Sequence, residues 1–326
     1  MLVVEFLVKR IAQGLLIVFL TSLIIFTLLR VVPGDPVRLI VGGMAPPDVV
    51  EKVATKMGLR DPIIVQYGRY MERLLHGDMG QSYLRPRSGM VATGGQYIDP
   101  TKSQMAPVAE LILERAPLTL QLGAVALVFA LMMAFPIGVA GGLHPSGWQS
   151  RLAFGVQSLF VSIPNFWLAI ILILFVSVKL ELLPALGYKN FAYTILPAFV
   201  LAVEITPFIV RTLTTSLGEV MQANFIDEAR VRGLARRRIV YAHALRNAAV
   251  PLVNLLGIQL STLIGGVLVI EYIFDYPGLG DLTVVSVVGR DFPVIQGIAI
   301  ATSAVFVFIN IIVDLVAYLI DPRVEL

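Results

Sequence analysis

DEARVRGLARRRIVYAHALRN, residues Asp227–Asn247, separates two apolar stretches: ILPAFVLAVEITPFIVRTL, residues Ile195–Leu213, and AAVPLVNLLGIQLSTLIGGVLVI, residues Ala248–Ile270. Each apolar stretch has about the 20 residues that an α-helix needs to cross the hydrocarbon core of a membrane. Of all 326 residues, 57% are hydrophobic and only 14% are charged, whereas soluble domains carry about a quarter charged residues. We therefore expect an all-α integral membrane protein.

Six apolar stretches predict six transmembrane helices: Ile11–Val32, Leu118–Gly141, Leu152–Val178, Ile195–Leu213, Ala248–Ile270 and Val294–Ile320. The first is longer than the apolar region of most signal peptides, and no cleavage pattern follows it, so we expect a retained helix. The spans divide the chain into three parts. These are an N-terminal helix (1–32), a segment between helices 1 and 2 (33–117), and a five-helix core (118–326) that contains an arginine-rich segment at 215–247.

Basic residues in the short loops predict the orientation. With the N-terminus inside, the cytoplasmic side receives Lys9, Arg10, Arg151 and the Arg230–Arg246 cluster, while the two short outside loops hold only Lys179, Lys189 and Arg290. Such an asymmetry places the basic loops in the cytoplasm. We therefore expect both termini inside and residues 33–117 outside.

Composition also excludes several kinds of site. The chain has no cysteine, and its three histidines lie far apart without ligand spacing, which excludes disulfides and gives no indication of a metal site. The basic residues do not form a face interleaved with aromatic residues, so nucleic acid is not an expected partner. Lys102-Ser103 is the only lysine followed by Ser or Thr, and Thr101 stands where a phosphate-binding loop needs glycine.

The segment after the first span contains helix signals. Asp48 and Glu51 have the spacing of a capping box, and Gly58 predicts the end of that helix. Asp61-Pro62 predicts a second helix that ends at His76-Gly77. Its expected apolar face consists of Ile63, Tyr67, Met71, Leu74 and Leu75. Residues Leu84–Pro107 predict a loop or mobile hairpin.

The arginine-rich segment has two interpretations from its residues alone. Ser216–Glu219 has a capping-box spacing that predicts a helix start at the membrane surface, and Gly233 predicts its interruption before a second short helix. Arg236–Arg238 suit contact with lipid headgroups. Ala229 and Gly233, four residues apart, suit close docking against another protein. Both interpretations stay open.

Polar residues inside the spans are candidates for a solute route. Glu204 lies in the middle of the fourth span, where a charge is costly unless it faces protein or water. It is either a structural hydrogen-bond partner or part of the route. The candidate pathway residues are Ser162, Asn165, Glu204, Asn254, Gln259 and Thr262, whereas Asn310 and Asp314 are expected to make packing contacts.

The pattern Asp227-Glu228-Ala229-x-x-x-Gly233 resembles the Glu-Ala-Ala-x-x-x-Gly loop of binding-protein-dependent ABC importer permeases. His243–Asn247 with Pro251 is similar to the dipeptide/oligopeptide (peptide/nickel) branch. Further motifs match the first, B-type, permease subunit of that branch: Pro33–Pro36, Gly77–Ser82, Pro277–Gly280, Asp291–Gln296 and Asp321–Arg323. Two features depart from the pattern, Asp227-Glu228 in place of Glu-Ala and an apparent insertion at about 87–105.

The resemblance implies a half-transporter in the bacterial inner membrane, working by alternating access. Its implied partners are a homologous second permease, two ATPase subunits (identical or a heterodimer), an extracytoplasmic solute-binding protein and membrane lipid. The chain itself would need no cofactor and catalyse no reaction, since ATP and Mg²⁺ would bind the ATPases. The expected solutes are dipeptides or oligopeptides, with a nickel complex, glutathione or a sugar as alternatives. The implied ATPase-coupling residues are Phe225, Asp227, Glu228, Ala229, Arg232, Gly233, Leu234 and His243.

Two other classes of protein remain as distant alternatives. Gly278-Leu-Gly-Asp281 matches the Gly-x-Gly-Asp of intramembrane aspartyl proteases, but these enzymes need a second aspartate in a neighbouring span. A proton-coupled secondary transporter could use Glu204.

Overall fold

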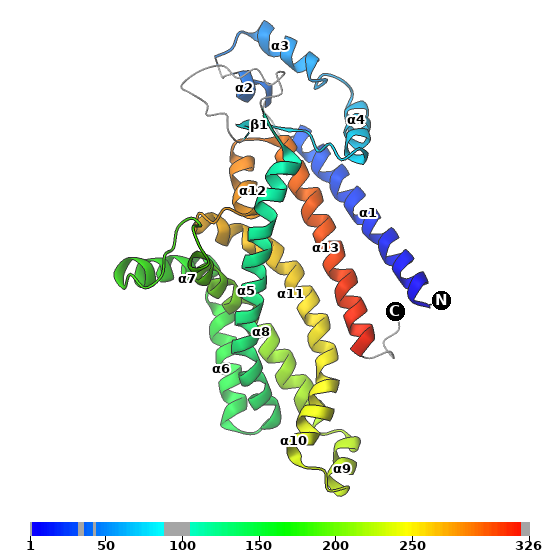
Figure 1. Ribbon diagram of the computed structural model, residues 1–326, viewed down its shortest axis with the longest axis vertical. Coiled ribbons are helices and arrows are strands. Elements are labelled where there is room, and N and C mark those ends of the chain that lie inside the picture. Colours follow the sequence, from blue (N-terminus) through cyan, green and yellow to red (C-terminus); the bar gives the residue numbers. More distant parts are fainter. Residues whose placement is uncertain (1, 32–35, 42–43, 88–104, 321–326) are drawn as a thin grey trace. The chain divides into compact units, whose positions relative to one another are not determined.

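The computed structural model describes residues 2–31, 36–41, 44–87 and 105–320 (Figure 1). The chain forms two compact units. The central unit comprises Met1–Leu7, Leu118–Pro277 and Phe306–Leu326. The N-terminal unit comprises Val8–Pro117 and Gly278–Val305. Three long helices, α1, α5 and α13, contribute residues to both units, and each unit is described by itself below.

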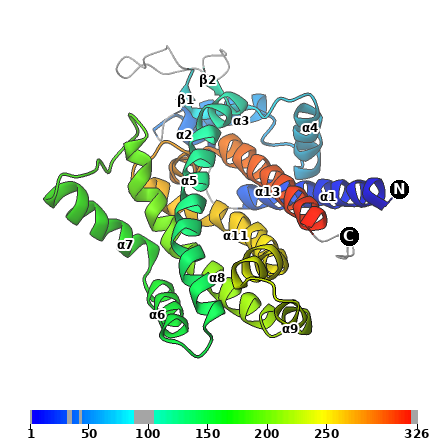
Figure 2. The same cartoon turned by 60° about the horizontal axis from the view of Figure 1, so that its bottom comes forward.

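The central unit is built around α8 (Ala192–Val220), whose membrane span is 72% buried, against 28% or less for the other long spans. Most of α5 (Val108–Leu143), α6 (Trp148–Ser162), α7 (Asn165–Leu172) and α11 (Leu245–Ile273) pack against α8 (Figures 1 and 2). The unit also contains the π-helical η1 (Ile173–Lys179), α9 (Asn224–Val231), α10 (Arg236–Arg238), the π-helical η2 (Ile239–Ala244) and the end of α13 (Phe292–Ile320).

Glycines allow α5 to lie directly against α8. A β-carbon at Gly138 would stand 2.7 Å from Leu213 Cβ, and one at Gly142 would stand 2.9 Å from Leu217 Cβ. Contacts this short are not found between real side chains, so the approach of the two helices requires glycine here. Small residues at helix interfaces are typical of membrane bundles, where close packing rather than water exclusion drives association.

The N-terminal unit combines short helices with a two-stranded sheet. Its elements are most of α1 (Leu2–Val31), α2 (Pro36–Val41), α3 (Pro47–Lys56), α4 (Ile63–Leu75), β1 (Gln81–Pro86), β2 (Met105–Pro107), the start of α5, α12 (Leu279–Val288) and the start of α13. β1 and β2 pair antiparallel. One apolar cluster joins the start of α5 to α12 and α13 through Val108, Ile112, Leu282, Val294 and Ile298.

Five helices among the described residues are long and apolar enough to cross a membrane: Val8–Val31, Val108–Leu143, Ala192–Val220, Arg236–Leu263 and Phe292–Val316. The prediction of the third span as one helix, Leu152–Val178, is wrong. Its two halves, Trp148–Ser162 and Asn165–Lys179, are bent by 89°. The cause is Pro164, which disfavours helical geometry in the residue before it, and Ile163 is extended (φ −94°, ψ 116°). Counted as one broken span, the pair makes six.

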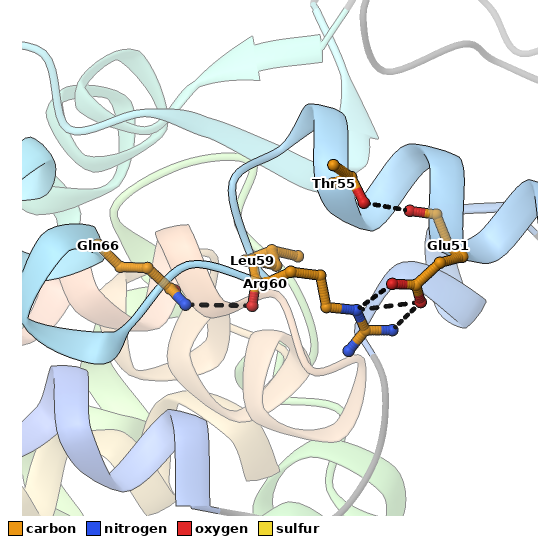
Figure 3. A network of polar contacts seen from close by, with 5 residues as sticks. All are labelled: Glu51, Thr55, Leu59, Arg60 and Gln66. Atoms are coloured by element: carbon orange, nitrogen blue, oxygen red, sulfur yellow. Dashed lines mark hydrogen bonds and ion pairs between the residues drawn. The ribbon is translucent and has the colours of Figure 1, made fainter.

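The helix signals after the first span are partly correct. Asp48 does not cap α3, because the N-cap is Pro46 and Asp48 lies inside the first turn. Glu51, the predicted reciprocal acid, instead accepts hydrogen bonds from Arg60 at 2.7–3.1 Å (Figure 3). Gly58 ends this helix region with φ +69°, as predicted.

The second predicted helix is confirmed as α4, which follows Pro62 and ends before His76 and Gly77 (φ +80°). Tyr67, Met71 and Leu74 pack around Phe26 and Tyr70, as the apolar face predicted. Ile63 and Leu75 of that predicted face are exposed. The ends of the predicted hairpin pair as β1 and β2, while residues 88–104, 33–35 and 321–323 lie outside the described residues.

Candidate functional site

The first helix of the arginine-rich segment (215–247) begins later than the sequence predicted. Ser216–Glu219 does not start a helix but belongs to the end of α8, which continues to Val220. Leu217 and Gly218 are buried there against the rest of the central unit, so packing keeps the chain helical through the apparent capping box. The helix of the predicted coupling residues is α9, which starts at Asn224 after Ala223 in an extended conformation.

Gly233 ends α9, as predicted, through a hydrogen-bonded C-terminal motif. The Gly233 N–H donates to Arg230 O at 3.0 Å and the Leu234 N–H donates to Ala229 O at 3.1 Å. This pair of bonds is a Schellman motif, which needs a left-handed residue, and Gly233 has φ +74°. A β-carbon at Gly233 would meet nothing within 4 Å. The glycine is therefore required for its backbone conformation and not for space.

Ala229 and Gly233 do not form a docking ridge, so that interpretation is wrong. Ala229 is buried together with Ile226 in a cluster of the chain's own residues. The other buried members are Leu217 of α8, Ile239 and Ala244 of η2, and Ala248 of α11. The small side chain of Ala229 serves this internal packing, which joins α9 to the ends of two long helices.

The opposite face of α9 is exposed and carries two apolar side chains among charged ones. Phe225 is 41% exposed and Val231 is 88% exposed. The flanking charges form ion pairs along the helix, Asp227 with Arg230 at 2.9 Å and Glu228 with Arg232 at 3.9 Å. We call Phe225, Asp227, Glu228, Val231 and Arg232 the outer face of α9. Val231 was missed by the sequence interpretation, although it lies three residues after Glu228 on the same side.

The remaining coupling candidates do not lie on this face. Leu234 is half-buried and packs against the Ile226 cluster. His243 is half-buried, and its carbonyl oxygen accepts a hydrogen bond from Asn247 Nδ2 at 2.8 Å. Arg236–Arg238 are exposed on α10, where Arg237 lies over the Tyr241 ring at 5.9 Å. The arginines and the outer face of α9 thus belong to different helices.

Glu204 and Asn165 come together inside the central unit. Asn165 Nδ2, in the first turn of α7, donates to Glu204 Oε2 at 2.6 Å. A β-carbon at Gly266 of α11 would stand 3.1 Å from the same oxygen. Three helices therefore meet at this carboxylate. Its hydrogen bond within the chain agrees with the interpretation of Glu204 as a structural hydrogen-bond partner.

The other pathway candidates separate into exposed and buried side chains. Asn254 and Thr262 are exposed on one face of α11, eight residues apart with Ile258 between them, whereas Gln259 is buried. Ser162 is exposed at the end of α6 and donates to Ser158 O. Asn310 donates to Ser261 Oγ at 3.2 Å, which confirms a packing contact between α13 and α11.

Sequence reasoning missed a second acid of α11. Glu271 is fully buried and accepts a hydrogen bond from Thr119 Oγ1 of α5 at 2.7 Å. A lone acid directly after a long apolar run is the signal that could have found it. Nearby in the same unit, Gln121 donates to Thr194 Oγ1 at 3.1 Å, and Thr194 is hydrogen-bonded to Tyr276. These bonds join α5, α8 and the end of α11.

In the N-terminal unit, two of the sequence motifs meet. Ser82, in the Gly77–Ser82 motif, donates through Oγ to the buried carboxylate of Asp291, in the Asp291–Gln296 motif. The same carboxylate accepts the Tyr83 N–H at 3.0 Å. Asp281, on which the protease alternative rests, forms an ion pair with Arg115 at 3.3 Å.

Comparison with known proteins identifies the family. "Binding-protein-dependent transport system inner membrane component" matches residues 119–326, and the N-terminal domain of the same systems' membrane components matches residues 3–123. A Brucella abortus protein named as a peptide transport system permease is 34% identical over 97% of this chain and 98% of its own length. The glutathione transport system permease protein GsiC of Escherichia coli K12 is 32% identical over 98% of this chain and 99% of its own length.

A solved structure agrees on the fold. The membrane subunit matched in an inward-facing structure of the MetNI methionine ABC transporter superposes with a TM-score of 0.57 at 22% identity, over 65% of this chain and 97% of that chain. Because the chain matches this family along its length, we do not retain the protease and secondary-transporter alternatives. The chain belongs to the inner membrane components of binding-protein-dependent transport systems and is a permease subunit of an ABC importer.

Proposed function

We propose that this permease subunit passes dipeptides or oligopeptides into the cytoplasm by alternating access. Its proposed partners are a homologous second permease, two ATPase subunits that bind ATP and Mg²⁺, and an extracytoplasmic solute-binding protein. Two relatives along nearly the whole chain support the peptide class, one named for peptide and one for glutathione transport. The chain itself is proposed to catalyse no reaction.

The observation that carries the coupling role is that α9 has one buried face and one exposed face. Its inner face is fixed to α8, η2 and α11 through Ile226 and Ala229, while its outer face exposes Phe225 and Val231. An exposed apolar pair surrounded by charges is typical of an interaction surface. We infer that this outer face docks on an ATPase, so that movement of the ATPase moves α8 and α11 together.

In the proposed topology, both termini and α9 lie in the cytoplasm and residues 33–117 lie outside. The basic loop residues support this orientation. Because the chain has no cysteine, single cysteines at Lys52 and at Arg237 can test it. Cysteine at Lys52 should react with an impermeant maleimide in spheroplasts with the inner membrane intact, and cysteine at Arg237 should react only after lysis. The reverse labelling would contradict the topology.

The exposed face of α11 is our candidate for the solute route. Polar side chains such as Asn254 and Thr262 are unfavourable against lipid, so they suit a water-filled path or the second permease. Glu204 is proposed to orient Asn165 beside that path. A cysteine at Thr262 should react with a water-soluble maleimide, whereas one at Phe154, an exposed apolar residue of α6, should not. Equal reactivity at the two positions would contradict the assignment.

The coupling role is tested in the reconstituted complex. Val231→Asp places a charge in the proposed apolar contact and should lower solute-stimulated ATP hydrolysis about ten-fold or more, as expected for the loss of a buried apolar side chain at an interface. Tyr241→Asp is the matched control, since Tyr241 is also exposed, at 63%, but belongs to η2. Full stimulation in Val231→Asp, with the ATPases retained, would contradict the coupling role. The solute class is tested separately, by identifying the ligand that co-purifies with the binding protein.

A further inference from the structure

The N-terminal unit contains a cavity of about 470 Å³ that the coupling function does not use. Its wall includes Arg30 of α1, Tyr70 and Arg73 of α4, Ser82 of β1 and Gln296 of α13. The segment Lys56–Leu59, at the end of α3, closes another side. The volume is within the range of roughly 300–1,000 Å³ that small-molecule sites occupy.

Two of the residues that line the cavity each have a buried polar atom without a hydrogen-bond partner in the part of the chain that the structure describes. These atoms are Tyr70 Oη and Gln296 Nε2, on side chains that are each 5% exposed. Buried polar groups in native proteins are almost always hydrogen-bonded. Both atoms are donors, since an amide nitrogen can only donate and burial raises the pKa of Tyr70 to about 12, which keeps the phenol protonated.

The charged groups of the wall are predominantly positive. Arg30 Nε donates to Gln66 Oε1 at 3.0 Å, and its guanidinium lies 3.5 Å from the centre of the Phe26 ring. Arg73 Nε donates only to a backbone carbonyl, that of Arg69, at 3.4 Å. Within the described residues, neither Arg30 nor Arg73 has a carboxylate within 4 Å. Lys56 adds a further positive charge to the wall, and Arg69 pairs with Asp61 at 2.5 Å.

One acid, Asp78, also lines the cavity, and its Oδ1 accepts the Gly80 N–H at 2.8 Å. The wall therefore offers a set of donors and cations that internal partners satisfy only in part. A ligand with several acceptor oxygens and a negative charge fits this set. Guanidinium groups in particular present paired N–H donors that match carboxylate and phosphate.

We propose that this cavity is an oxyanion-binding site that takes a carboxylate or phosphate group, contacted by Arg30, Arg73, Tyr70 and Gln296. The oxyanion can come from a free small anion or from the phosphate of an anionic lipid headgroup, because Arg30 lies at the end of the membrane span Val8–Val31. The site lies in the N-terminal unit and does not depend on the coupling role of α9.

The test uses the full chain in maltoside micelles, which contain no phosphate. Saturable binding of radiolabelled inorganic phosphate is expected, and Arg73→Gln should weaken it about ten- to a hundredfold, as for loss of a charge-assisted hydrogen bond. Tyr70→Phe, which removes one buried oxygen and little volume, should weaken it as well. Arg60→Gln is the matched control, because Arg60 is paired with Glu51 (Figure 3) and is not among the residues that line the cavity.

A second arm distinguishes the two sources. If the lipid is the ligand, phosphatidylglycerol should raise the melting temperature of the wild type more than diacylglycerol does and should displace labelled phosphate. Both effects should be lost in Arg73→Gln and kept in Arg60→Gln. If a free anion is the ligand, phosphate should bind and phosphatidylglycerol should not displace it. The proposal is overturned if neither compound binds in an Arg73-dependent manner, or if Arg60→Gln weakens binding as much as Arg73→Gln.

Discussion

Two contacts of this permease, one in each unit, hold segments of the chain together by different means. In the central unit, α5 contacts α8 through glycines, and Gly138 leaves no room for even a β-carbon beside Leu213. In the N-terminal unit, polar side chains reach between segments, as Asp291 does to Ser82 and Tyr83, and Asp281 to Arg115. The contact between α5 and α8 depends on shape, whereas the contacts of Asp291 and Asp281 depend on hydrogen bonds and charge. Substitutions at these places should therefore have opposite profiles: added volume should damage the contact between α5 and α8, and lost polarity the contacts of Asp291 and Asp281.

The largest effect is expected from added volume on α5. Gly138→Leu should destabilise the central unit by about 1–3 kcal/mol or more, because the side chain must displace Leu213 and the backbone carbonyl of Val210. Gly123→Leu, on the same helix, is the control, since a β-carbon at Gly123 meets nothing within 4 Å. The measurement is the melting temperature of the purified chain. Equal melting temperatures for the two variants would break the comparison.

Lost polarity in the N-terminal unit should have a similar or slightly smaller effect. Asp291→Ala leaves the Tyr83 N–H and the Ser82 hydroxyl without their acceptor, at a cost of about 1–3 kcal/mol. Asp291→Asn keeps one acceptor oxygen and should lose less. Limited proteolysis of the full chain should show faster cleavage near β1 in the alanine variant. Unchanged cleavage in both would mean that the polar contacts do not hold this unit.

Substitutions at Gly233 test the effect of backbone conformation alone, because a β-carbon added there meets nothing within 4 Å. Gly233→Leu must adopt the left-handed backbone at a cost of roughly 1–2 kcal/mol, although the space around it is open. Gly233→Asn should be nearly neutral, because asparagine tolerates this conformation. Solute-stimulated ATP hydrolysis of the assembled importer should fall for leucine and be kept for asparagine. A loss that follows side-chain volume instead would restore the docking-ridge interpretation that the burial of Ala229 contradicts.

The smallest effect is expected for a surface pair. Arg60→Gln removes the ion pair with Glu51, whose side chains are 48% and 59% exposed. Solvent screening limits such pairs to a few tenths of a kcal/mol. The melting temperature should shift by no more than a degree or two. A larger shift would show that even exposed charges are structural in the N-terminal unit.

The sequence predicted the fold class, five of the spans and the end of α9, because apolar length and glycine chemistry are local signals. The helix α9 ends before Gly233 as predicted, because Gly233 is required for its left-handed backbone conformation. The predictions that were wrong in this segment concern residues whose structure depends on contacts with distant parts of the chain. Ser216–Glu219 has the spacing of a helix start, but the burial of Leu217 against the rest of the unit continues α8 through it. Ala229 looked available to a partner because its burial comes from residues of α8, η2 and α11.

The site residues divide in the same way. Glu204 was recognised because a charge inside an apolar span is conspicuous, but its bond with Asn165 depends on how α7 is placed after the bend at Pro164. Glu271 was missed because it lies just beyond the apolar run, and only the packing of α5 shows that it is buried. Val231 was missed because an exposed valine has no sequence signature.

The bend at Pro164 has a consequence for the surrounding bilayer. The helix α6 has 15 residues, and at 1.5 Å per residue it is about 22 Å long, shorter than a hydrocarbon core of about 30 Å. The half after the bend, α7 with η1, is of the same order of length. Phe154, Trp167 and Phe175 nevertheless expose apolar surface on these two halves. Lipid beside them meets a short hydrophobic wall, a mismatch that a membrane accommodates by local thinning. We therefore expect this side of the subunit to be the most sensitive to acyl-chain length.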